Sequence, residues 1–139
     1  MIMHVVRMAV HPDVTPDQLT SALQRMAEAN AQIGPETGVR SGVFGRDFGG
    51  DFDFGAVSTI DDIDAYETMM NHPSHLAMDR IGLPLVRRFH SIDVTDDPDP
   101  EIGRRIADVH RRRFEAHPDI LALVRGVEDY QGSGVPGRD

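Results

Sequence analysis

The sequence predicts an α+β protein with the ferredoxin-like order β-α-β-β-α-β, in which helices cover one face of an antiparallel sheet. Three observations support this fold class. Segments rich in β-branched and apolar residues alternate with segments of helical periodicity. A glycine-containing hairpin loop joins the two central β segments, and a length of 139 residues suits one domain with a single core.

The first half of the chain supplies a strand, a helix and a hairpin. Residues 2–10 are rich in β-branched and apolar types, which predicts a strand that is covered on both faces. The segment Thr15-Pro16-Asp17-Gln18 has the residues of a capped helix start, and helical spacing continues to about residue 32. Strands are expected over 39–46 and 52–60.

The second half supplies the remaining helices and the last strand of the core domain. Residues 61–70 predict a helix with acidic residues in its first turn, followed by a second helical pattern over 76–88. Residues 89–94 predict the fourth strand. The chain offers little to cover the second face of the sheet, so we expect a homodimer.

An Asp- and Pro-rich linker leads into a C-terminal extension with helices expected over 101–115 and 119–124. The last stretch is glycine-rich and polar, which predicts disorder. The expected organisation is a core domain at 1–97, a helical extension at 98–128 and a disordered tail at 129–139.

Composition argues against several classes of function. The formal net charge of −9 disfavours nucleic acids and anionic membrane surfaces as partners. The run Arg111-Arg112-Arg113 is interpreted as a solvated, acid-paired helix face. The absence of cysteine excludes disulfides and thiolate metal sites. The apolar residues 1–10 are too few to span a bilayer and no cleavage signal follows them, so a cytoplasmic location is expected.

The motif His72-Pro73-Ser74-His75 is the best candidate for chemistry. Proline fits the first turn of a helix, which places His72 in the break between two helices and His75 in the first turn of the second. A helix N-terminus disfavours the imidazolium, so His75 should be neutral near pH 7 and able to accept a proton. Alternatively, His72 caps the helix and His75 is a satisfied packing residue. His4, in the first strand, likewise needs a hydrogen-bond partner or a functional role.

An apolar pocket between the sheet and the helices would give these histidines a place to act. Its methionine-rich lining would suit a flexible or aromatic organic ligand. A solid core built from the same residues is the alternative, because spacing does not distinguish the two. The expected wall residues are Val6, Met8, Leu23, Met26, Ala56, Met69, Met78 and Phe89.

The chain resembles the stress-responsive α/β barrel family, called Dabb, over about residues 2–95. The matching segments are His4-Val5-Val6-Arg7-Met8, Val14-Thr15-Pro16-Asp17-Gln18, Gly45-Arg46-Asp47 and His72-Pro73-Ser74-His75. The resemblance implies a ferredoxin-like homodimer whose sheets close a shared barrel. Because the family includes olivetolic acid cyclase, a fern hydroxynitrile lyase and many members without assigned activity, it implies the fold more firmly than the reaction.

Similarity to the cyclase implies roles for individual residues. Its catalytic histidine matches His75, and its pocket histidine on the first strand matches His4. Its catalytic tyrosine corresponds to Met69 here, which argues against the specific cyclase activity. Tyr66 lies one helical turn earlier, about 5 Å along the axis. It either serves a differently placed substrate or packs with its hydroxyl group in water.

Three functions remain open from the sequence. In the first, neutral His75 abstracts a proton next to a carbonyl group or from a hydroxyl group, and His4 or Tyr66 stabilises the oxyanion. Cofactor-independent cyclisation or C–C bond cleavage would fit this arrangement. In the second, the protein binds a small apolar molecule or acts in a stress response without catalysis, which Met69 favours. The third is a metal or haem site of His4, His72 and His75, but this histidine spacing often occurs without metal, so no metal or cofactor is expected.

Overall fold

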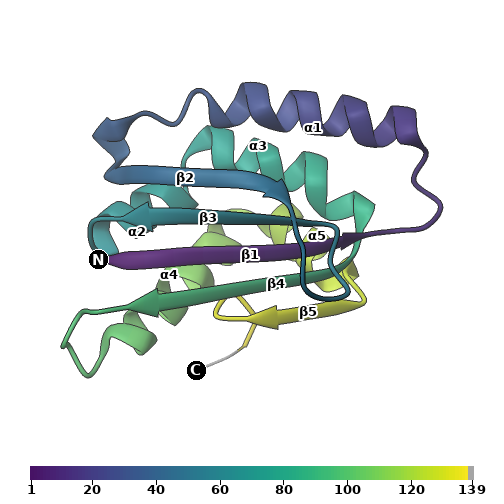
Figure 1. The fold of residues 1–139 in the computed structure, drawn as a ribbon. Helices are drawn as coiled ribbons and strands as arrows, with labels where there is room; N and C mark the ends of the chain where they lie inside the picture. Colours follow the sequence, from purple (N-terminus) through teal and green to yellow (C-terminus); the bar gives the residue numbers. More distant parts are fainter. Residues whose placement is uncertain (138–139) are drawn as a thin grey trace.

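A five-stranded sheet organises the computed structural model, which describes residues 1–137. In Figure 1 most of the helices lie behind the sheet, and the first helix lies above it. The strands are β1 (Ile2–Val10), β2 (Val39–Arg46), β3 (Phe54–Ile60), β4 (Val86–Thr95) and β5 (Asp129–Gly132), in the spatial order β2-β3-β1-β4-β5. The first four strands pair antiparallel and β5 joins β4 in parallel. The predicted α+β, ferredoxin-like class is confirmed, with a mixed rather than purely antiparallel sheet.

Within residues 1–137, five α-helices accompany the sheet, and the first three start with a side-chain cap. They are α1 (Pro16–Asn30), α2 (Ile63–Met70), α3 (Pro73–Gly82), α4 (Ile102–Ala116) and α5 (Pro118–Gly126). Thr15 and Gln18 exchange the hydrogen bonds of a capping box at the start of α1. At the start of α3, Nδ1 of His72 accepts a hydrogen bond of 3.2 Å from the backbone N–H of Ser74. Helix α3 ends earlier than expected, because a 3₁₀ turn at Leu83–Leu85 leads directly into β4.

Strand β5 lies in the segment for which the sequence predicted disorder. The ring of Tyr130 stacks on that of Phe89, with centroids 5.3 Å apart. Beyond the strand, the backbone N–H of Ser133 donates to the carbonyl oxygen of Ser91 at 2.8 Å. These contacts with β4 supply burial and hydrogen bonds that composition does not reveal. Residues 138 and 139 of the predicted disordered tail lie outside the described residues.

The interior between the sheet and the helices contains two apolar clusters. The first consists of Val6, Met8, Leu76, Leu83, Val86, Phe114, Ile120, Val124 and Val127. The second consists of Ile2, Ile60, Ile63, Tyr66, Met69, Met70, Ile106 and Val109. Both clusters combine residues of the first 97 positions with residues of α4 or α5. The helical extension therefore packs into the same core as the domain that precedes it.

The opposite face of the sheet is apolar and exposed within the described chain. Its large exposed side chains include Met3, Val43, Val57, Ile92 and Val94. The strand register brings them together, because Val57 pairs with Val43 of β2, and Met3 pairs with Val94 of β4. Contiguous apolar patches of this kind mark interaction surfaces.

Candidate functional site

A buried carboxylate on β4, that of Asp93, is the centre of the polar groups between the sheet and the extension. Nδ1 of His4 lies 2.8 Å from Asp93 Oδ1, and the hydroxyl group of Tyr66 donates to Oδ2 at 2.8 Å. The hydroxyl group of Ser133 donates to the same Oδ2. Only 2 % of the Asp93 side chain is exposed. We call His4, Tyr66, Asp93, His110 and Ser133 the Asp93 cluster.

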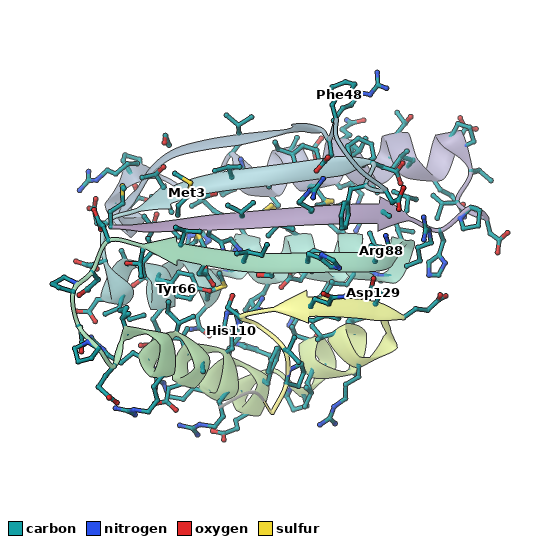
Figure 2. The ribbon with its side chains drawn as sticks, turned by 60° about the horizontal axis from the view of Figure 1, so that its bottom comes forward. Met3, Phe48, Tyr66, Arg88, His110 and Asp129 are labelled. Atoms are coloured by element: carbon teal, nitrogen blue, oxygen red, sulfur yellow. The ribbon has the colours of Figure 1, made fainter. Side chains whose placement is uncertain are left out.

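Within this cluster, His110 of α4 contacts the hydroxyl group of Tyr66, toward which it points in Figure 2. Its Nε2 lies 2.8 Å from the tyrosine oxygen. Because an ionised carboxylate only accepts hydrogen bonds, the single hydroxyl proton of Tyr66 goes to Asp93. The tyrosine oxygen must then accept from His110, which requires a proton on Nε2. Nδ1 of His110 keeps its lone pair, and it is buried without a hydrogen-bond partner among the described residues.

His75 lies in the first turn of α3, where the sequence placed it, and beside a buried ion pair. Its Nε2 is 3.9 Å from Oδ2 of Asp79, and 16 % of its side chain is exposed. Asp79 accepts a hydrogen bond from Arg113 of α4, which also donates from Nε to the carbonyl oxygen of Met70 at 2.8 Å. The extension thus contacts the surroundings of both His75 and Tyr66.

Burial keeps the rings of His75 and His110 neutral. Desolvation lowers the pKa of His75 to about 3, although the charge of Asp79 acts in the opposite direction. Desolvation likewise lowers the pKa of His110 to about 4, against the opposing charge of Asp93. The sequence predicted a neutral His75 from the helix N-terminus, whereas loss of hydration has the larger effect in the structure.

The carboxyl and phenol groups of the cluster keep their ordinary protonation states for a different reason. Burial pushes the pKa of Asp93 upward, but the hydrogen bonds it accepts, that from His4 first, outweigh burial and leave the pKa below its usual value. The pKa of Tyr66 is raised well above its usual value by burial and then by the charge of Asp93. The site therefore contains a carboxylate and a protonated phenol, together with neutral imidazole rings at His75 and His110, near pH 7.

The three residues predicted to carry chemistry lie in one region of the interior. His4 and Tyr66 share Asp93, and the charge of His4 is close enough to contribute to the pKa of His75. Tyr66 is fully buried, so its hydroxyl group bonds within the protein instead of reaching water. Met69, which occupies the position of the cyclase tyrosine, packs in the second apolar cluster.

The predicted pocket walls are distributed over several parts of the core. Val6, Met8, Ala56 and Phe89 belong to the first apolar cluster or pack against it, whereas Met69 belongs to the second. Leu23, Met26 and Met78 are half-buried, and α1, which carries the first two, packs on α3 rather than against the sheet. A cavity of about 350 Å³ lies elsewhere, and its walls are His90, Ile92, Tyr130, Gln131, Gly132 and Val135.

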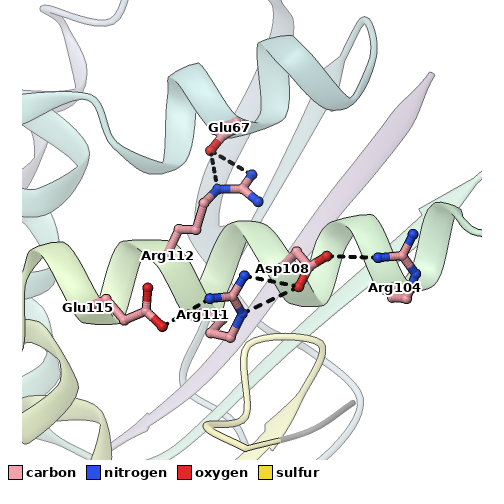
Figure 3. Close-up of polar contacts among 6 residues, drawn as sticks. All are labelled: Glu67, Arg104, Asp108, Arg111, Arg112 and Glu115. Carbon is pink, nitrogen blue, oxygen red and sulfur yellow. Dashed lines mark hydrogen bonds and ion pairs between the residues drawn. The ribbon is translucent and has the colours of Figure 1, made fainter.

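The arginine run of α4 is largely acid-paired, as the sequence predicted. Figure 3 shows Arg104, Arg111 and Arg112 with the carboxylates of Glu67, Asp108 and Glu115. Arg113 differs from its neighbours because it is buried and contacts Asp79. Within residues 1–137 there is no group of histidine and acidic side chains that could hold a metal ion. No helix in the same range is long and apolar enough to cross a membrane.

Sequence reasoning missed Asp93, His110, Arg113 and Ser133, although two of them had a usable signal. Asp93 follows Phe89 by four residues on β4, so both side chains point to the same face of the sheet, the one toward the helices. His110 follows Ile106 by one helical turn and therefore shares its buried stripe. A polar residue on such a stripe needs a buried partner. No comparable pattern identifies Ser133.

Solved structures define the class of the fold. A dimeric ferredoxin-like protein of unknown function from Thermobifida fusca is 26% identical over 68% of this chain and 89% of its own, with a TM-score of 0.59. The hydroxynitrile lyase of Passiflora edulis is 13% identical over 70% and 94%, with a TM-score of 0.57. SnoaB, a cofactor-independent oxygenase from Streptomyces nogalater, is 22% identical over 72% and 97%, with a TM-score of 0.51.

The family itself is shown by a match over most of the chain. The protein belongs to the Stress responsive A/B Barrel Domain family, Dabb, whose family model matches residues 2–96. The family predicted from the sequence motifs is therefore confirmed, with nearly the same limits. No curated protein matches the chain. The matched region ends before α4, so His110, Arg113 and Ser133 lie outside it.

Proposed function

We propose that the protein is a cofactor-independent enzyme that performs acid–base catalysis on a small organic molecule. The observation that carries this proposal is the Asp93 cluster, which buries a carboxylate, a phenol and imidazoles beside neutral His75. Buried titratable groups with strongly shifted pKa values are concentrated at functional sites. Similarity in fold to a hydroxynitrile lyase and a cofactor-independent oxygenase supports a catalytic role.

In the proposed reaction, His75 accepts a proton from a carbon next to a carbonyl group or from a hydroxyl group. The imidazolium that forms is stabilised by Asp79, whose Oδ2 lies 3.9 Å from Nε2. The sequence left open whether His4 or Tyr66 stabilises the resulting oxyanion. Tyr66 already donates its single hydroxyl proton to Asp93 and has none left for an oxyanion, so we assign this role to His4. Cyclisation and C–C bond cleavage both fit these roles.

Replacing His75 tests this role directly. We expect His75→Ala to lower kcat/KM by about a hundredfold to ten-thousandfold, because a general base is lost. The substrate would first be identified by mass spectrometry of small carbonyl and hydroxyl compounds incubated with the wild type. His72→Ala is the matched control, since His72 only caps α3, and it should keep most of the activity. Equal turnover in His75→Ala and wild type would exclude His75 as the base.

A noncatalytic small-molecule-binding or stress-response protein is the second candidate. The dense packing around Tyr66, which has no exposed surface, and the methionine at position 69 favour it. In that case a ligand should bind His75→Ala as tightly as the wild type, and neither protein should form product. Isothermal titration with the compound that copurifies with the protein would measure this.

We also propose that the exposed sheet face forms a homodimer, as is described for the ferredoxin-like proteins of T. fusca and Bacteroides fragilis. Val57→Glu should raise the dimer dissociation constant at least about a hundredfold, because an unpaired charge would be buried at the interface. Light scattering after size-exclusion chromatography measures the mass. Thr20→Glu, on an exposed position of α1, is the control and should leave the mass unchanged. A Val57→Glu protein with wild-type mass would place the interface elsewhere.

A further inference from the structure

Nδ1 of His110 is an unsatisfied hydrogen-bond acceptor inside the Asp93 cluster. Only 4 % of His110 is exposed, and Nδ1 has no hydrogen-bond partner among the described residues. Because Tyr66 donates its only hydroxyl proton to Asp93, His110 must donate to the tyrosine oxygen, and its ring proton is on Nε2. Nδ1 therefore presents a lone pair, and buried acceptors in native proteins normally have a partner.

The backbone of Gly134 covers this acceptor. A Cβ atom at Gly134 would lie 3.3 Å from Nδ1 of His110 and 2.9 Å from the hydroxyl oxygen of Tyr130. The two polar atoms thus face the same point, at which the chain has no side chain. Burial keeps the hydroxyl group of Tyr130 protonated by raising its pKa, so one donor and one acceptor lie beneath Gly134.

The segment that contains Gly134 also borders the cavity of about 350 Å³. We call residues 132–135 the strap. Its first and last residues, Gly132 and Val135, line the cavity together with Tyr130. Its middle residues contact the interior, because Ser133 donates to Asp93 and Gly134 lies over His110. The strap therefore contacts the cavity and the Asp93 cluster at once.

We propose that this cavity is the outer part of a ligand site, and that Nδ1 of His110 accepts a hydrogen bond from the ligand when the strap is displaced. This inference rests on the proposed function and names its substrate class. The ligand is a neutral molecule with an O–H or N–H donor on an apolar or aromatic body. The lone pair of Nδ1 and the nearby negative charge of Asp93 both repel an anionic group. A neutral O–H or N–H donor would instead form the hydrogen bond that Nδ1 lacks. The apolar body would occupy the space beside Tyr130 and Val135, next to the edge strand β5. Because Ile92 also lines this cavity, the second protomer of the proposed homodimer would cover the side of the ligand that faces Ile92.

Nuclear magnetic resonance with phenol as the probe tests the site. Anisole is the matched control because it has the same ring without the O–H donor. In ¹⁵N-labelled protein, long-range ¹H–¹⁵N correlations should show His110 protonated on Nε2 and unprotonated on Nδ1. Phenol should shift the Nδ1 resonance saturably, and anisole should not. An Nδ1-protonated tautomer, or equal shifts with both compounds, would overturn the proposal.

Two variants test separately the roles of the His110 acceptor and of the strap in phenol binding. His110→Gln keeps an N–H donor for Tyr66 but replaces the ring acceptor Nδ1 by an amide oxygen at another position, so phenol binding should weaken at least tenfold. Ser133→Ala removes the hydrogen bond from the strap to Asp93, so displacement should become easier and phenol affinity should rise severalfold. Unchanged phenol affinity in a folded His110→Gln protein would overturn the proposal. If His110→Gln does not fold, an unchanged or weaker affinity in Ser133→Ala would overturn it.

The binding readout is independent of turnover, so failures of the two proposals can be told apart. Loss of turnover in His75→Ala without any phenol shift at His110 would reject the ligand site alone. Phenol binding at His110 in a protein without turnover would support the ligand site and reject the catalytic proposal.

Discussion

Arg113→Met should destabilise the protein by about 3–5 kcal/mol, because it leaves the largely buried carboxylate of Asp79 without its arginine partner. The substitution also removes the donor to the carbonyl oxygen of Met70. Methionine preserves much of the apolar volume of the arginine side chain, so packing accounts for little of the loss. Urea unfolding followed by circular dichroism measures the free energy.

The neighbouring residue provides the control for this prediction. Arg112 pairs with Glu67 at 2.7 Å, but 47 % of its side chain is exposed. Arg112→Met should therefore change the free energy of unfolding by only about 0–1 kcal/mol. Equal losses for the two substitutions would contradict the view that Arg113 anchors the extension to α3. Partial recovery in Arg113→Met combined with Asp79→Asn would identify the unpaired carboxylate as the cause.

Asp93→Asn is the second substitution with a large expected effect, about 3–5 kcal/mol of lost stability. The carboxylate accepts from His4, Tyr66 and Ser133, and an amide cannot accept at the position of its own NH₂ group. The substitution therefore removes a charge-assisted hydrogen bond and leaves a buried donor facing the NH₂ group, unless His4 moves its ring proton from Nδ1 to Nε2. Asp108→Asn on the surface of α4 is the control and should cost less than about 1 kcal/mol.

The pH dependence of the same variant has a definite sign. The pKa of Asp93 is lowered in the folded state, so its contribution to stability is complete above the unfolded-state value of about 4. It is lost as pH falls through the folded-state pKa. The stability difference between wild type and Asp93→Asn should therefore be constant from neutral pH to about pH 5 and shrink below about pH 4. A difference that shrinks already near pH 6 would assign the effect to a histidine.

The fold was predictable wherever local patterns determine structure. Periodicity and capping residues identified the strands and helices of the core domain, including the Thr15 capping box and the start of α3 after His72. Strand β5 was not predictable, because its order depends on long-range contacts such as the stacking of Tyr130 on Phe89. The glycine-rich composition around it indicates a flexible chain when those contacts are unknown.

The candidate site was predictable only where its residues belong to the matched family region. His75 was named from the His-Pro-x-His motif, and His4 and Tyr66 were named from the family resemblance. The structure places all three in one region of the interior. Their partners were not predicted, because Asp93 and His110 contact them across 27 to 89 residues of sequence. Spacing along the chain carries no information on such pairings unless the packing of α4 is known.

The Asp93 cluster draws its members from positions 4 to 133, which has a consequence for biosynthesis. A ribosome delivers the chain from its N-terminus, and domains generally fold as units during or after synthesis. Residues 2–96 emerge while Tyr66 still lacks His110 and Asp93 still lacks Ser133. Until residues 110 and 133 have been translated, the nascent family domain therefore lacks two of the five members of this buried cluster.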